Sequence, residues 1–207
     1  MTTLLETLLN VSVSEMLSAK AVDDSDKNTS EARLEFSDTR KRKWFHERTA
    51  KHIRMVQEAA KQIADAYPQY AKQLMQNARK HDVSKYKEPE YEPYIELSWC
   101  KKINKDPTTL QNWNKIQNAI LHHLQYNKHH PEYYSDDIEA DKPIDVSAMD
   151  DISICEMVAD WVAMSKELQT NTPREWYISK RNTRWIFSDE QDKLIDKLLS
   201  VFDKESE

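Results

Sequence analysis

The chain contains no glycine among its 207 residues. Average usage would put glycine at about 7% of positions, and glycine is the residue that most readily supplies positive φ and close backbone approach to phosphate. Its absence argues against a P-loop, against a Gly-x-Gly-x-x-Gly dinucleotide turn and against tight β-hairpins. The sequence therefore predicts an all-α fold, in which helices are joined by polar connections.

Charge and cysteine usage narrow the class of protein further. The 36 acidic residues outnumber the 30 basic ones, for a net charge of −6, and the one dense basic run is Arg40 to Lys43. No broad footprint for a nucleic-acid backbone is visible, although a small anion could be held locally. Cys100 and Cys155 lie far apart, no secretory signal is apparent, and no apolar run approaches the ~20 residues of a membrane span. We expect a cytoplasmic protein without a membrane segment.

Residues 1–40 and residues 41–207 differ in pattern. Apolar residues at helical spacing over residues 3–20 predict an amphipathic helix, and the polar stretch over 23–30 predicts a linker. This segment could cap the core, pair between subunits or dock a partner, so a homodimer is possible. Residues 41–207 are long enough to form one helical domain with its own core.

Helical periodicity covers most of residues 41–207. Helices are expected from about 39 to 67, 69 to 81, 108 to 126, 150 to 168 and 189 to 202. The first of them presents one apolar face, made by His52, Val56, Ala59, Ala60, Ile63 and Tyr67. Pro89 and Pro93 predict an irregular loop over 87–94, whose acidic residues are expected to be solvated, although Glu90 could border a site.

The histidines and a few aspartates are the residues that indicate a binding or catalytic site. All seven histidines lie between His46 and His130. His52 alone could be a packed histidine bonded to a carbonyl, but His81-Asp82 offers adjacent nitrogen and oxygen donors of the kind that divalent cations take. Asp160 interrupts the apolar run 157–164 of a predicted helix. An unpaired carboxylate there would cost several kcal/mol, so a metal or a buried cation should compensate it.

These residues occur in the order His52, His81-Asp82, Asp160 on three separate predicted helices. In this order the sequence resembles the HD-domain superfamily of metal-dependent phosphohydrolases, over about residues 46–168. The resemblance implies a helical bundle in which these four side chains bind a divalent metal between the helices, and it implies a nucleotide as the small anionic substrate. Two histidines and two aspartates suit Mn, Fe, Co, Ni or Zn.

Two further features resemble the HD-GYP branch, which hydrolyses cyclic dinucleotides. Lys85 matches the lysine of its His-Asp-x-x-Lys motif, and His122-His123 resembles the paired histidines that supply a second metal. The sequence departs from that branch because no histidine lies between Asp82 and His122, and because residues 129–133, His-His-Pro-Glu-Tyr, replace the Gly-Tyr-Pro loop. Adjacent helical residues diverge by ~100°, so at most one of His122 and His123 would point most directly at a given site.

The expected catalytic roles combine this resemblance with metal chemistry. Asp82 would orient a water activated by the metal, and Lys85 would clamp phosphate or act as a general acid. One of His122 and His123 would neutralise charge that develops on the phosphate. Further candidate contacts to substrate phosphate, with polar surface as the alternative for each, are His123, His129, His130, Arg181 and Arg184.

The sequence thus favours metal-dependent hydrolysis of a nucleotide phosphomonoester or a linear or cyclic phosphodiester. Two other functions remain open. One is an HD-fold di-iron oxygenase, in which His122 or His123 helps to hold the second iron, and the other is a non-catalytic, metal-stabilised module that binds a nucleotide or a partner protein. A last possibility is that Asp160 pairs with a basic residue and the histidines only pack.

Overall fold

The computed structural model describes residues 30–136, 142–169 and 171–203, with side chains from Ser37 on. These parts of the chain confirm the all-α prediction, because α-helices and short 3₁₀ turns dominate and two strands contain two residues each. The described α-helices are α2 (Ser30–Ala66), α3 (Pro68–Ala78), α4 (Tyr91–Lys102), α5 (Trp113–Tyr126), α6 (Asp151–Leu168), α7 (Pro173–Lys180) and α8 (Asp189–Leu199). Among the described helices, none combines the length and the apolar character that a membrane crossing requires.

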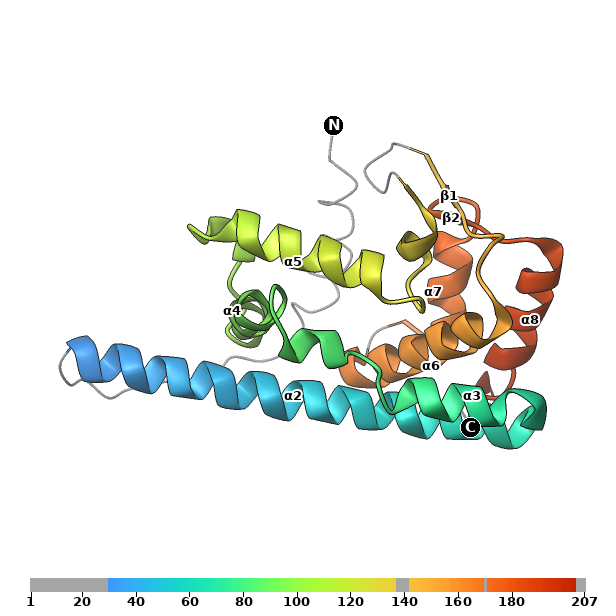
Figure 1. Cartoon of the computed structure of the whole chain (residues 1–207), viewed down its shortest axis with the longest axis horizontal. Coiled ribbons are helices and arrows are strands. Elements are labelled where there is room, and N and C mark those ends of the chain that lie inside the picture. Colours follow the sequence, from blue (N-terminus) through green and yellow to red (C-terminus); the bar gives the residue numbers. More distant parts are fainter. Residues whose placement is uncertain (1–29, 137–141, 170, 204–207) are drawn as a thin grey trace.

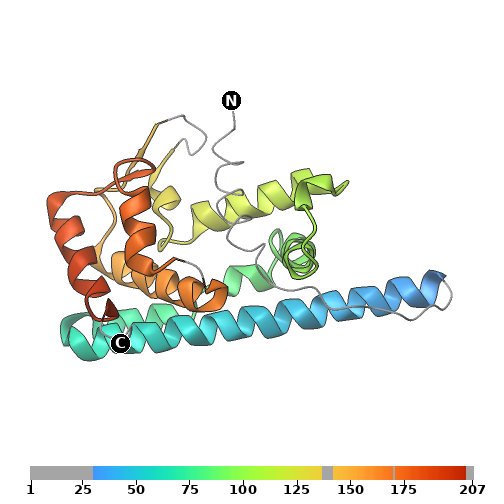
Figure 2. The same ribbon diagram turned by 180° about the vertical axis from the view of Figure 1, so that it is seen from behind.

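Helix α2 forms one long side of the molecule, and α3, α4 and α6 pack against it (Figures 1 and 2). Its packed face is the one predicted, since Val56, Ala60 and Ile63 are fully buried. The helix begins nine residues before the expected position 39 and runs without a break through residues 40 and 41, where the pattern suggested a boundary. The amphipathic helix expected over residues 3–20 lies outside the described residues, as does the expected linker except for its last residue.

Helix α6 is the central element, because it contacts α2, α3, α7 and α8. Asp150 begins it as predicted, accepting a hydrogen bond from the Ser153 backbone N–H at 2.9 Å. Every residue from Ser153 to Ala163 is buried except Asp160, which is partly exposed. A helix apolar on nearly all sides lies inside a core, so its few polar side chains face other protein groups and not bulk water.

Helices α4 and α5 pack on each other beside α2 (Figure 1). The prediction of an irregular loop over 87–94 was wrong in its second half, because α4 begins at Tyr91. Pro93 is tolerated there because the backbone N–H groups of a first helical turn have no partner within the helix. Helix α5 begins at Trp113 and not near 108, where residues 107–109 instead form a 3₁₀ turn.

Three elements near the C-terminal end were not predicted. Helix α7 has a complete capping box between Thr172 and Glu175. Strands β1 (Ile144–Asp145) and β2 (Trp185–Ile186) pair in parallel, with Ile144 opposite Trp185. A two-residue pair is too short to show strand periodicity in a sequence. The predicted last helix is present as α8.

Positive φ occurs in this chain despite the absence of glycine. In the described residues it is adopted by Asp82 (57°), Asn104 (54°), Gln169 (53°) and Asn182 (61°). The absence of glycine therefore does not exclude positive φ, because aspartate and asparagine tolerate the left-handed region better than most residues. Asp82 is also one of the predicted metal ligands.

Candidate metal centre

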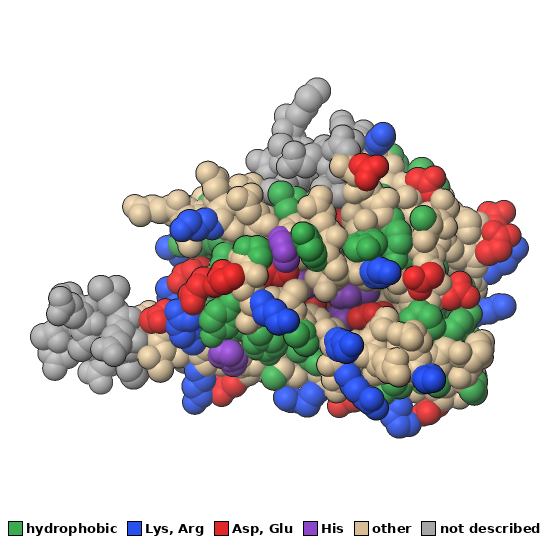
Figure 3. Space-filling model, in the orientation of Figure 1, with side chains coloured by type: hydrophobic (Ala, Val, Ile, Leu, Met, Phe, Trp, Pro, Cys, Tyr) green, Lys and Arg blue, Asp and Glu red, His purple; other side chains and the backbone are tan. Residues whose placement is uncertain are grey.

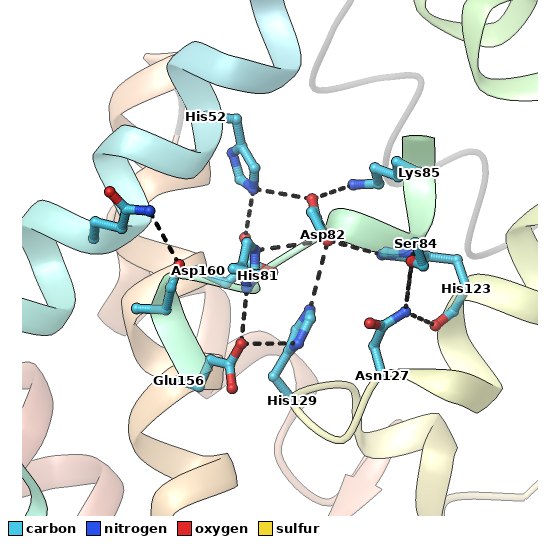
Figure 4. A network of polar contacts seen from close by, with 12 residues as sticks. His52, His81, Asp82, Ser84, Lys85, His123, Asn127, His129, Glu156 and Asp160 are labelled. Atoms are coloured by element: carbon cyan, nitrogen blue, oxygen red, sulfur yellow. Dashed lines mark hydrogen bonds and ion pairs between the residues drawn. The ribbon is translucent and has the colours of Figure 1, made fainter. Parts of the chain in front are cut away.

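The predicted ligands converge from three separate parts of the fold (Figure 4). His52 comes from α2, His81 and Asp82 follow α3, and Asp160 comes from α6. His52 Nε2 lies 3.1 Å from Asp160 Oδ1, and His81 Nε2 lies 3.7 Å from the same oxygen. His52, His81 and Asp160 each offer one ligand atom within 4.8 Å of the others. The structure thus brings together residues that are up to 108 positions apart in the sequence.

The left-handed backbone of Asp82 lets two adjacent residues serve one site. Successive side chains on a helix diverge by ~100°, but α3 ends at Ala78 and the chain turns at Asp82 with φ of 57°. As a result His81 Nε2 lies 3.7 Å from Asp82 Oδ1. Both side chains are almost completely buried. Non-glycine residues in this conformation are concentrated at functional sites.

A second group of histidines lies on the other side of Asp82. His123 Nε2 from α5 is 3.2 Å from Asp82 Oδ1, and His129 Nε2 is 3.9 Å from the same oxygen. His130 completes this group, in which three ligand atoms lie within 4.8 Å of one another. Asp82 Oδ2 meanwhile lies 3.6 Å from His52 Nε2. The carboxylate of Asp82 therefore stands between two sets of potential ligands.

The residues expected to contact phosphate lie in several different environments. His129 and His130 belong to the second group of potential ligands. His122, expected to be a ligand or catalytic, stacks on the Tyr126 ring and is in none of the described groups that could hold a metal. Lys85 pairs with Asp82 Oδ2 at 2.5 Å. Arg181 is partly exposed and pairs with Asp192.

Buried carboxylates behind the histidines orient their rings. Glu156 Oε1 lies 3.0 Å from His81 Nδ1 and 3.4 Å from His129 Nδ1, so one oxygen serves a histidine of each group. A histidine that donates its Nδ1–H to a carboxylate presents the lone pair of Nε2 to a metal. Sequence reasoning missed Glu156, although it precedes Asp160 by four residues and therefore shares its helix face.

Glu90 lies behind the His123 ring and Glu167 behind the His52 ring. Glu90 Oε2 lies 2.9 Å from His123 Nδ1, and its other oxygen lies 2.7 Å from His122 Nδ1. Only 1% of Glu90 is exposed, so the expectation that it is solvated was wrong and the alternative that it borders the site holds. Glu167 Oε2 lies 3.3 Å from His52 Nδ1.

Opposite charges keep the central aspartates ionised although burial alone would favour their neutral form. Burial opposes ionisation of Asp160, but the adjacent rings of His52 and His81 hold its pKa well below the usual value. Burial likewise opposes ionisation of Asp82, yet Lys85 and then His81 keep its pKa well below that of an ordinary aspartate. Ionised carboxylates are the form that binds metal.

The histidines of the two groups differ in their affinity for protons. Burial disfavours the charged ring of His81, but Asp82, Asp160 and Glu156 outweigh it and raise the pKa to about 10. Burial, with His81 and other histidines nearby, lowers the pKa of both His129 and His130. His129 and His130 are thus neutral near pH 7, which is the form that binds metal, whereas a metal bound by His81 must displace a proton.

Several buried ligand atoms in this centre have no hydrogen-bond partner among the described residues. Buried polar atoms in native proteins are almost always paired, so such a concentration requires an explanation. These atoms are His81 Nε2, Asp82 Oδ1, His129 Nε2, His130 Nε2 and Asp160 Oδ1. All are lone-pair donors from imidazole or carboxylate groups, which fit a borderline divalent cation. The residues present therefore fit a metal centre, here defined as His52, His81, Asp82, His123, His129, His130 and Asp160.

The alternative that Asp160 pairs with a buried lysine or arginine receives no support among the described residues. The described ion pairs of Asp160 are with His52 and His81, and none is with a lysine or arginine.

The centre is accessible from one face. In Figure 3, histidine and acidic side chains appear at the bottom of a hollow near the middle of the face, with basic side chains at its border. A pocket of about 190 Å³ adjoins the centre, because Asp160 and His130 line it together with Arg184 and three tryptophans. Arg181 is not among its lining residues.

A family model covers the part of the chain that contains the candidate metal centre. The model of a family described as "Family of unknown function (DUF5662)" matches residues 41–201. The chain belongs to this family. The matched residues include every residue of the metal centre and the carboxylates behind its histidines. No curated protein and no solved structure matches the chain.

Proposed function

We propose that this protein is a metal-dependent phosphohydrolase of the HD-domain kind, acting on a nucleotide phosphomonoester or a linear or cyclic phosphodiester. The observation that carries the proposal is the position of Asp82, whose carboxylate lies close to buried histidines of both groups, 3.6 Å from His52 Nε2 and 3.2 Å from His123 Nε2. The order His52, His81-Asp82, Asp160, by which the sequence resembles that superfamily, supports it from the sequence side.

Two ions fit the geometry better than one. The first would be held by His52, His81 and Asp160, and the second by His123, His129 and His130, with Asp82 shared between them. Nitrogen and oxygen ligands without a thiolate suit Mn, Fe, Co, Ni or Zn. Such ions, when bound, lower the pKa of a coordinated water to ~7 and polarise a phosphoryl oxygen.

Other side chains prepare the centre for an anionic substrate. Asp82 stays ionised beside Lys85, and the ammonium of Lys85 is partly exposed, so it can also approach a phosphate oxygen. His122 binds Glu90, which in turn orients His123. In this proposal His122 acts on the centre through Glu90, and His123 is the one of the pair that lies beside Asp82.

A di-iron oxygenase is the second candidate. The observation that favours it is the set of three histidines on the second side of Asp82, since imidazole ligands also suit iron. The two functions differ in the reaction that follows metal binding, so one experiment separates them.

The experiment measures phosphate release and oxygen uptake by the purified full chain loaded in turn with each candidate metal. Substrates are p-nitrophenyl phosphate, bis-p-nitrophenyl phosphate and a panel of nucleoside monophosphates and cyclic nucleotides. Asp82→Asn is the test variant, and Asp65→Asn, on the exposed side of α2, is the matched control.

Hydrolysis by the wild type and by Asp65→Asn, with loss in Asp82→Asn, supports the phosphohydrolase. Oxygen uptake with iron and no hydrolysis would assign the oxygenase instead. Nucleotide binding without any turnover would support the third function, a metal-stabilised binding module.

A further inference from the structure

The pocket beside the metal centre has an aromatic wall. Trp161 and Trp185 stack with their rings nearly parallel, 12° apart, and their centroids 5.7 Å apart. Trp176 also lines the pocket and meets Trp185 edge to face. Trp161 and Trp185 are over nine-tenths buried, so this wall is fixed by the core and does not depend on a mobile loop.

The pocket has little excess charge apart from the metal centre. Among the residues that line it, Arg184 is the one cationic side chain, and it pairs with the buried carboxylate of Glu132. Glu132 Oε1 also accepts a hydrogen bond from Trp185 Nε1 at 3.2 Å. A phosphate needs surplus positive charge, which this wall does not offer. An uncharged part of a ligand therefore fits the pocket, while a phosphate fits the metal centre at its edge.

The side chain of Arg184 also forms part of the pocket wall. Arg184 Nε is buried and has no hydrogen-bond partner among the described residues. The guanidinium lies over the Trp185 ring, 4.7 Å from its centroid, which fixes its plane against the aromatic wall. Because Nε has almost no accessible surface, the part of Arg184 that a ligand can contact is the plane of the guanidinium, and a planar ring can stack on such a plane.

We propose that this pocket binds an uncharged heteroaromatic ring of the nucleobase class, packed against the wall formed by the tryptophans and the guanidinium plane of Arg184. The reacting phosphate of the same molecule then lies at the metal centre, next to Asp160 and His130. This inference rests on the proposed phosphohydrolase function and adds to it the part of the substrate that is recognised.

The test uses nucleosides, which carry the ring but no phosphate. Binding of adenosine, guanosine, cytidine and uridine to the full chain is measured by calorimetry and by tryptophan fluorescence, both with metal and with a chelator present. The variants are Trp176→Leu and Arg184→Lys, and the matched control is Trp113→Leu, because Trp113 at the start of α5 does not line the pocket. Circular dichroism establishes that each variant is folded.

At least one nucleoside is expected to bind to the wild type and to Trp113→Leu. Loss of an aromatic contact to a base is worth ~1–3 kcal/mol, so Trp176→Leu should weaken binding roughly 5- to 150-fold. Arg184→Lys keeps the charge but removes the planar guanidinium of the wall, and it should weaken binding by roughly 5- to 10-fold.

Two results would overturn the inference. The first is phosphoester hydrolysis without measurable binding of any nucleoside, which would leave the proposed function intact. The second is binding of plain indole as tight as that of any nucleoside and unchanged in Arg184→Lys. Nucleoside binding that depends on Trp176, in a protein that hydrolyses nothing, would instead support the pocket and refute the phosphohydrolase.

Discussion

Replacement of Glu156 by glutamine removes the charge shared by one histidine on each side of Asp82. The change is nearly isosteric and leaves an oxygen that can still accept a hydrogen bond. It removes the negative charge that lies 3.0 Å from His81 Nδ1 and 3.4 Å from His129 Nδ1. We expect Glu156→Gln to weaken metal binding without unfolding the protein.

The size of the effect follows from the number of rings involved. Loss of a carboxylate behind a metal-bound histidine typically costs 10- to 100-fold in metal affinity, which is about 1.4–2.8 kcal/mol. Because Glu156 serves a histidine in both groups, an effect near the upper end is expected, and both ions should be affected. Burial opposes the charge of Glu156, but hydrogen bonds from His129 and His81 outweigh it and lower its pKa to about 2, so the carboxylate is ionised at neutral pH.

The assay is competition for Zn or Co between the protein and a chelating dye of known affinity, at pH 7. Glu58→Gln, an equivalent change at an exposed position of α2, is the control and should bind metal like the wild type. Unchanged affinity for both ions in Glu156→Gln, with the fold retained, would refute the idea that this carboxylate orients the metal ligands.

Three further predictions concern stability and reactivity. Ile63→Ala removes a fully buried side chain of α2 and should lower the free energy of unfolding by about 2–5 kcal/mol in urea titrations. The control Ile178→Ala, at a position 65% exposed, should change it by less than about 0.5 kcal/mol. Ser188→Ala deletes the hydrogen bond to the Gln191 backbone N–H that caps α8 and should cost about 1 kcal/mol in the same titrations; no loss would mean that the cap is not formed. Burial raises the pKa of the Cys155 thiol from an ordinary value of 9.0 to about 12, so iodoacetamide at pH 8 should alkylate it about 1000-fold more slowly in the folded protein than in urea. Because the unfolded chain then loses this proton first, stability should also fall as pH rises from about 9 toward 12, and rapid alkylation of native protein would contradict the burial.

The main helices and the inner ligands could be predicted from the sequence because both depend on local signals. The 3.6-residue periodicity over 52–63 placed the buried face of α2, and Asp160 was conspicuous as one charge in an apolar run. Neither inference required knowledge of which helices pack together.

What could not be predicted depends on tertiary contacts or on weak local signals. Glu90 follows a proline in a charged segment that looks solvated, and it becomes buried only because α5 places His122 and His123 over it. His129 and His130 lie in a loop, where periodicity gives no direction for a side chain. Their convergence on Asp82 depends on how the chain leaves α5 at Tyr126.

The absence of glycine was informative for the fold and misleading for the site. It correctly excluded folds built on glycine-rich turns, since the described chain contains only a two-residue parallel strand pair. It did not exclude left-handed backbone, and Asp82 adopts this conformation at the centre of the ligand set. A short polar side chain can replace glycine where its own chemistry is needed at the turn.

The most direct test of the account is metal content per chain, measured by mass spectrometry on protein purified without added metal, beside a His81→Ala/Asp82→Ala double variant. The account predicts at least one equivalent of Mn, Fe, Co, Ni or Zn per wild-type chain, rising toward two on titration, and loss of this metal in the variant. No metal in the wild type and none taken up on titration would contradict the metal centre, and with it both the phosphohydrolase and the oxygenase.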